Sequence, residues 1–159
     1  MEPEDLDFLY SIENDDDLWE VGITNAPYSR YTLTSYIVNN TNDIYTDRQV
    51  RFVMENQEGR AVGMLDITHF DPRHLRAEIG IVVADHDRNQ GYGRQALCHA
   101  IDYCRDILHL HQVFAIIDKG NSSSLALFRS VGFQEGAVLR QWLFGHEKYT
   151  DAVLMQIFL

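Results

Sequence analysis

The spacing of apolar side chains predicts two helices at the start of the chain. From Pro3 to Asn14 apolar residues recur every three or four positions, behind a proline and two acidic residues that suit a first helical turn. A second helix is predicted to be capped by Thr32 or Thr34 and to end in the polar cluster Asn39–Asp43.

Alternating apolar and polar residues then predict three strands in succession. They span Gln49–Asn56, Arg60–Phe70 and Leu75–Ala84, and the segments "QEG" and "DPRH" between them are typical of turns. Because short turns join neighbouring antiparallel strands, the pattern predicts an antiparallel meander.

Helical spacing returns at Gly91 and continues to about Leu108, where apolar residues fall on one stripe. The run His111–Asp118 that follows is almost entirely apolar, which is typical of a strand buried on both faces. A buried strand is therefore predicted between helices.

The rest of the chain predicts one short helix and two strands. The helix is capped by Asn121 or one of the two serines after it and ends at Gly132. The strands lie around Val138–Phe144 and Ala152–Leu159. The predicted order is ααβββαβαββ, and without an internal repeat or linker it indicates one α/β domain over residues 1–159.

Composition and charge narrow the functional classes. The 159 residues are 45% hydrophobic, which supplies enough apolar surface for one core. Twenty-four acidic against 13 basic residues give a net charge of -11, which disfavours nucleic acid and favours cationic partners. No apolar run approaches the roughly 20 residues of a membrane helix, and the first residues are acidic, so we expect a soluble, cytoplasmic protein.

The stretch "DRNQGYGRQAL", Asp87–Leu97, places two glycines between a predicted strand and a predicted helix. Backbone N–H groups at a helix start converge on an anion, and glycine keeps side chains out of its way. The Rossmann and P-loop patterns are not completed here.

"RNQGYG", Arg88–Gly93, does satisfy the Arg/Gln-x-x-Gly-x-Gly/Ala signature of the GNAT N-acetyltransferases. The segment "NSSSLALFRSVGF", Asn121–Phe133, resembles a second motif of that family, Asn-x-x-(x)-x-x-Leu-Tyr-x-x-x-Gly-Phe. The ending "HEKYTDAVLMQIFL" resembles the last strand pair of its spermidine and ribosomal-protein-alanine acetyltransferase branch. The resemblance implies the GNAT fold, a mixed, mostly antiparallel central sheet flanked by helices.

The resemblance also implies acetyl-CoA as acetyl donor. Its pyrophosphate is expected on the amides of the glycine-containing loop, with two arginines adding contacts to phosphate oxygens, and its pantetheine arm beside the strand before that loop. The residues implied to bind it are Ile81, Val82, Val83, Arg88, Asn89, Gln90, Gly91, Tyr92, Gly93, Arg94, Asn121, Ser124 and Phe128.

Acetyl transfer to an amine requires a base, because an ammonium group with a pKa of about 10.4 costs roughly 4 to 5 kcal/mol to deprotonate at neutral pH. Glu78, in the strand "AEIGIVVA", matches an acidic residue of the spermidine acetyltransferases in register and is the candidate base; the alternative is an edge-exposed or salt-bridged glutamate. Glu78, Gly80 and Val82 share one face of the strand, so Glu78 reaches a site only if that face borders it.

Two positions depart from the family pattern. In the family the tyrosine of Leu-Tyr-x-x-x-Gly-Phe usually protonates the departing thiolate, but this chain has Phe128 there. Protonation of the thiolate is then left to water or to another phenol such as Tyr149. The resemblance also implies that a backbone N–H near Val82 stabilises the oxyanion of the tetrahedral intermediate. Relatives also have a strand before the segment that resembles Glu2–Asp5, so we expect a missing first strand and an open edge on the Gln49–Asn56 strand.

The leading hypothesis is transfer of acetyl to a primary amine by direct attack in a ternary complex. The acceptor stays open between a polyamine, a protein N-terminus, an amino sugar and an antibiotic amine, and analogy suggests a homodimer. The alternatives are a catalytically weakened CoA-binding sensor or interaction module, or a structural domain. His109 and His111 lack further ligands at metal spacing, so no metal is expected. Aromatic candidates for the acceptor pocket are Trp19, Tyr28, Tyr31 and Trp142.

Overall fold

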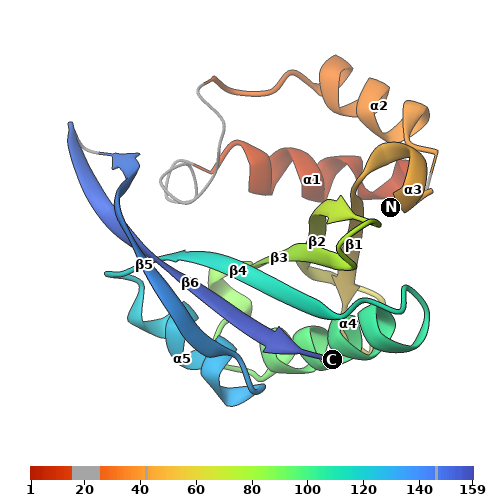
Figure 1. Ribbon diagram of the computed structural model, residues 1–159. Helices are drawn as coiled ribbons and strands as arrows, with labels where there is room; N and C mark the ends of the chain where they lie inside the picture. The colour runs from red at the N-terminus through yellow and green to blue at the C-terminus, as the bar shows by residue number, and fades with distance from the viewer. Residues whose placement is uncertain (16–25, 42, 146) are drawn as a thin grey trace.

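A computed structural model describes residues 1–15, 26–41, 43–145 and 147–159. Its six-stranded sheet has the order β1-β2-β3-β4-β6-β5, and all neighbouring strands run antiparallel except β3 and β4. Helices α1 and α2 lie on one side of the sheet, and α4 and α5 lie on the other (Figure 1). The strands are β1 (Val50–Glu55), β2 (Ala61–Asp71), β3 (Arg76–Val83), β4 (Gln112–Asp118), β5 (Gln134–Gly145) and β6 (Lys148–Phe158). The predicted meander and the mostly antiparallel sheet are confirmed.

The helices are α1 (Leu6–Glu13), α2 (Arg30–Asn39), α3 (Ile44–Asp47), α4 (Tyr92–Asp106) and α5 (Ser122–Ser130). The predicted cap of α2 is wrong, because the side chain of Ser29 accepts a hydrogen bond of 3.1 Å from the N–H of Thr32 and α2 starts earlier. Helix α3 was not predicted, since one turn is too short to show a helical period. None of these helices is long and apolar enough to cross a membrane within the described part of the chain.

Both faces of the sheet are covered by apolar side chains. The larger cluster joins the sheet to α4 and α5 and includes Leu97, Val113 and Met155. The smaller cluster joins it to α1 and α2 and includes Leu9 and Val82. Among the described residues only β2 pairs with β1, which therefore forms an edge of the sheet as expected.

The sheet divides between its two parallel strands. β3 pairs with β4 only from Arg76 to Glu78, while β4 stays paired with β6 along its whole length. The prediction that β4 is buried on both faces is only half correct. Val113 and the alternate residues after it are buried, whereas Phe114 and Ile116 are half-buried and line a cleft.

Candidate active site

A cleft of about 1320 Å³ opens where β3 and β4 separate. Its walls come from α1, α2 and α5 and from all six strands, so residues distant in sequence meet there. Glu78, Gly80 and Val82 line it. The strand face that carries Glu78 therefore borders the cleft, which is the condition that the sequence left open.

Glu78 lies at the last residue of β3 that pairs with β4. Its side chain is 21% exposed, and Oε2 lies 3.0 Å from Nδ1 of His69. Burial raises the pKa of Glu78 above its ordinary 4.5, while His69 and the backbone N–H of Ile116 act to lower it. A carboxylate with a raised pKa is a better proton acceptor at neutral pH, as a general base must be.

The two glycines of the predicted anion site have different structural roles. Gly91 is the N-cap of α4 with φ +89°, a left-handed conformation that glycine adopts without steric cost, and a Cβ there would meet open space. At Gly93 a Cβ would lie 3.2 Å from Cδ2 of Leu127 and 3.5 Å from Cγ2 of Val83. Gly91 thus sets the bend, and Gly93 lets the helix pack closely on β3 and α5.

The amides of this loop are available to a ligand. Across the described residues, no protein group accepts a hydrogen bond from the backbone N–H of positions 89 to 94. The first turn of α4 also holds no acidic side chain. This is the arrangement that a helix start offers to a phosphate.

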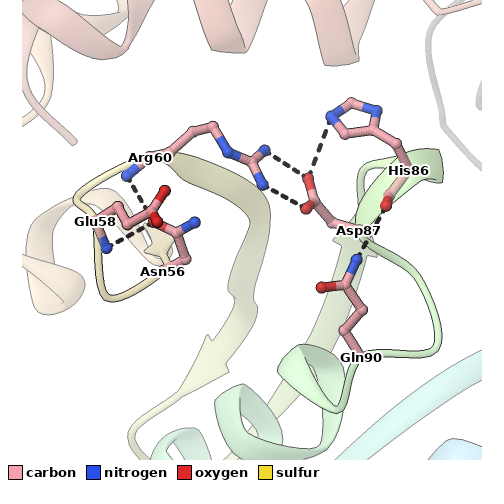
Figure 2. Close-up of polar contacts among 6 residues, drawn as sticks. All are labelled: Asn56, Glu58, Arg60, His86, Asp87 and Gln90. Carbon is pink, nitrogen blue, oxygen red and sulfur yellow. Dashed lines mark hydrogen bonds and ion pairs between the residues drawn. The ribbon is translucent and has the colours of Figure 1, made fainter.

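An ion pair between the buried Asp87 and the half-exposed Arg60 fixes the same loop. Asp87, 2% exposed, accepts two hydrogen bonds from the guanidinium of Arg60, at 2.6 and 2.8 Å, and His86 Nε2 lies 3.2 Å from it (Figure 2). Arg60 lowers the pKa of Asp87. Gln90 adds a hydrogen bond from its side-chain amide to the carbonyl of His86 (Figure 2). The loop after β3 is thereby tied to the turn before β2.

The arginines predicted at the phosphates differ in their surroundings. Arg88 pairs with Asp85 at 2.7 Å and donates from Nε to the carbonyl of Val83, so its guanidinium already has protein partners. Arg94 is exposed on the first turn of α4.

The second motif, Asn121–Phe133, begins at the N-cap of α5 and contributes three residues to the lining of the cleft. Asn121 uses its side-chain oxygen to cap α5, accepting from the N–H of Ser124 at 3.0 Å. Asn121, Ser124 and Phe128 all line the cleft. Phe128 is 2% exposed and packs edge to face on Phe133, with ring centroids 5.0 Å apart.

Tyr149, the phenol named as a candidate acid, is 63% exposed and packs on Phe144. It is not among the described residues that line the cleft. Of the aromatic acceptor candidates, Tyr28 and Trp142 line the cleft, and Tyr31 is exposed elsewhere. Trp19 lies outside the described residues.

Sequence reasoning missed most of the charged residues that line the cleft. Arg51 bridges Asp66, at 2.6 Å, and Glu13, and so joins α1, β1 and β2 beneath the cleft. The described lining residues hold five carboxylates against two guanidinium groups. In the sequence, only the net acidity of the chain indicated this excess of carboxylates, because the lining residues come from separate elements. The lining carboxylates are Glu13, Asp66, Asp71, Glu78 and Asp118, and the arginines are Arg51 and Arg76.

Comparison with known proteins decides the family. The acetyltransferase (GNAT) domain family matches residues 1–134. The chain belongs to this family. It is an N-acetyltransferase, and acetyl-CoA is the donor that such enzymes use.

Relatives and solved structures agree with this assignment. The chain is 26% identical over 158 residues to the spermidine N(1)-acetyltransferase of Escherichia coli K12, covering 99% of this chain and 83% of that protein. The phosphinothricin N-acetyltransferase of Alcaligenes faecalis is 28% identical over 113 residues, 69% of this chain and 57% of that one. The structure of Vibrio cholerae spermidine N-acetyltransferase in complex with CoA and spermine superposes with a TM-score of 0.86 at 25% identity, covering 99% of this chain and 92% of that chain.

The site of this GNAT acetyltransferase fits the donor. Unbonded amides precede a helix that Gly93 seats against the sheet, and beyond Glu78 β3 makes no pairs with β4. An anionic diphosphate suits the first feature, and an extended amide-containing arm suits the second. The binding roles of the individual residues stay predictions.

Replacing Phe128 with tyrosine, the residue of the family motif, tests the missing proton donor. We expect the fold to be retained and kcat to be unchanged or higher, because the ring already lines the cleft and the change adds one hydroxyl. Steady-state thiol release and the melting temperature of the F128Y variant measure this. A large fall in kcat with an unchanged melting temperature would assign the ring another role.

Proposed function

We propose that this protein acetylates a primary amine of a polyamine, by direct attack of the amine on acetyl-CoA in a ternary complex. The observation that carries the proposal is the half-buried Glu78 at the strand separation, in a cleft where the charged residues of the described lining are mostly acidic. A polycation gains from several carboxylates at once. The spermidine acetyltransferases similar to this chain support the same acceptor class.

Each step of the acetyl transfer is assigned to a group of the protein or to water. Acetyl-CoA supplies the activated thioester. Glu78 removes the proton that the acceptor nitrogen must lose, and a backbone N–H near Val82 stabilises the oxyanion. Because Tyr149 does not line the cleft in the described residues, we propose that water protonates the thiolate.

An acceptor screen tests the proposal. Purified protein with acetyl-CoA is offered spermidine, spermine, an amino sugar, phosphinothricin and a peptide with a free N-terminus, and free thiol is read. We expect the polyamines to give the highest kcat/KM, with a value that falls as salt is raised because exposed charge attraction is screened. Thiol release with the peptide and with no other amine would indicate that the acceptor is a protein N-terminus and not a polyamine.

Donor binding is tested apart from turnover. Acetyl-CoA at 100 times its dissociation constant is expected to stabilise the fold by about 2.7 kcal/mol, read as a rise in melting temperature. Phe128 favours one second function, a CoA-binding sensor, because it removes the usual proton donor. A thermal shift without thiol release from any amine would support the sensor, and no shift would contradict both.

We also propose that the chain forms homo-oligomers, with a dimer as the first step. Strand β5 is an edge of the sheet in the described residues, and Trp142 and Phe144 on it are 56% and 66% exposed. The related Vibrio cholerae enzyme has a dodecameric structure, with a TM-score of 0.83 at 26% identity. Light scattering measures the mass, and a monomer at micromolar concentration would contradict the proposal.

A further inference from the structure

His69 adopts a backbone conformation that strand residues rarely have. Its φ is 49°, at the irregularity where β2 leaves regular pairing with β3 between Thr68 and Asp71. Among non-glycine residues, histidine, asparagine and aspartate are the ones enriched at positive φ. Such irregularities re-aim side chains, and this one brings Nδ1 of His69 to 3.0 Å from Oε2 of Glu78.

The contact connects a half-buried carboxylate with solvent. The side chain of His69 is 75% exposed and that of Glu78 is 21% exposed. Thr68 Oγ1 lies 3.3 Å from the same ring nitrogen. An ion pair this exposed contributes little to stability, so the arrangement is not explained by folding alone.

Among the described residues, His69 is the titratable side chain that the structure pairs with Glu78. β4 contributes the Ile116 N–H and the apolar Phe114. Asp118 accepts hydrogen bonds from the Gly120 N–H and the Thr150 hydroxyl, and the other charged groups that line the cleft are engaged in ion pairs of their own. These are Arg51 with Asp66 and Glu13, and Arg76 with Asp71.

We propose that His69 is the proton relay of Glu78, which takes the proton that Glu78 removes from the acceptor amine and passes it to water. This rests on the proposed function. The amine proton moves to Oε2 of Glu78 and then to the unprotonated Nδ1 of His69. The imidazolium releases a proton from Nε2 to solvent. The ring returns to its starting tautomer when Nδ1 gives its proton to water and Nε2 regains one from water, so the carboxylate and the imidazole are both restored and only water is needed besides.

Two substitutions separate proton transfer from positioning. His69→Asn keeps a side chain suited to positive φ and a hydrogen-bonding group near Nδ1, but it cannot carry a proton. His69→Ala leaves space for imidazole added to the buffer. We expect kcat to fall roughly tenfold in both, part of the 10²- to 10⁴-fold that proton transfer contributes, and added imidazole to restore much of it in H69A. His74→Asn, on the exposed turn between β2 and β3, is the matched control and should keep wild-type kcat.

An NMR titration of the Glu78 carboxyl carbon gives a readout independent of turnover. Burial raises the pKa of Glu78 and His69 lowers it, so H69N should move the midpoint to higher pH. An unmoved midpoint, or wild-type kcat in H69N, would overturn the relay. If H69N keeps the wild-type kcat and H69A loses it, His69 holds Glu78 in place and does not carry its proton, which would also overturn the relay. A wild-type protein that acetylates no amine would instead overturn the proposed function, and the relay with it.

Discussion

Replacing Glu78 with glutamine is expected to lower kcat by about 10²-fold or more, with acetyl-CoA binding retained. General-base catalysis contributes roughly 10² to 10⁴ to rate, and glutamine keeps the size and hydrogen bonding of the side chain but cannot accept a proton. Thiol release at saturating polyamine measures the loss. The thermal shift with acetyl-CoA shows whether the donor still binds.

The pH dependence of wild-type activity tests the same role of Glu78. Burial raises the pKa of Glu78 above 4.5, and the base works only when ionised. Activity should therefore fall as pH is lowered through that raised pKa, in an acidic limb that E78Q lacks. Glu55→Gln, at the exposed end of β1, is the matched control and should leave kcat unchanged. Turnover of E78Q within twofold of wild type would place the base elsewhere.

Replacing Asp87 with asparagine is expected to weaken acetyl-CoA binding by roughly 10- to 100-fold, the effect of displacing binding groups by about 1 Å. Asparagine loses the charge attraction to Arg60, and this ion pair holds the loop whose amides are predicted to bind the diphosphate. Titration with acetyl-CoA measures the loss. Binding of acetyl-pantetheine, which has no diphosphate, should change much less.

Arg60→Met tests the same pair from its more exposed side, where the side chain is 49% exposed, and it leaves the buried Asp87 carboxylate without its ion-pair partner. The double variant should be no weaker than either single one, since both remove one interaction. Because Arg60 lowers the pKa of Asp87, the pair stabilises the fold at neutral pH, and this contribution is lost as pH falls through the lowered pKa. Asp102→Asn, in an exposed pair with Arg105 on α4, is the control. Equal losses for acetyl-CoA and acetyl-pantetheine would contradict a role at the diphosphate.

Local patterns predicted the features that depend on neighbouring residues. Helix α4 and the meander follow from apolar periodicity, and Gly91 was recognisable because a bend at a helix start is a local demand. The one-turn α3 and the Ser29 cap were missed, because one turn has no period and several polar residues there suit a cap equally well. The family motifs carried the predicted cofactor residues, which are likewise clustered in sequence.

Only the tertiary structure decided what lies together across elements. The sequence by itself determined the order of the elements other than the one-turn α3, the loop at Gly91 and Glu78 as a candidate base. The fold determined that Glu78 faces a cleft and meets His69, and that Arg60 binds Asp87, 27 residues away. The physical reason is that periodicity and turn chemistry act over a few residues. Strand register and the separation of β3 from β4 involve residues that are far apart in the sequence, so they depend on packing across elements.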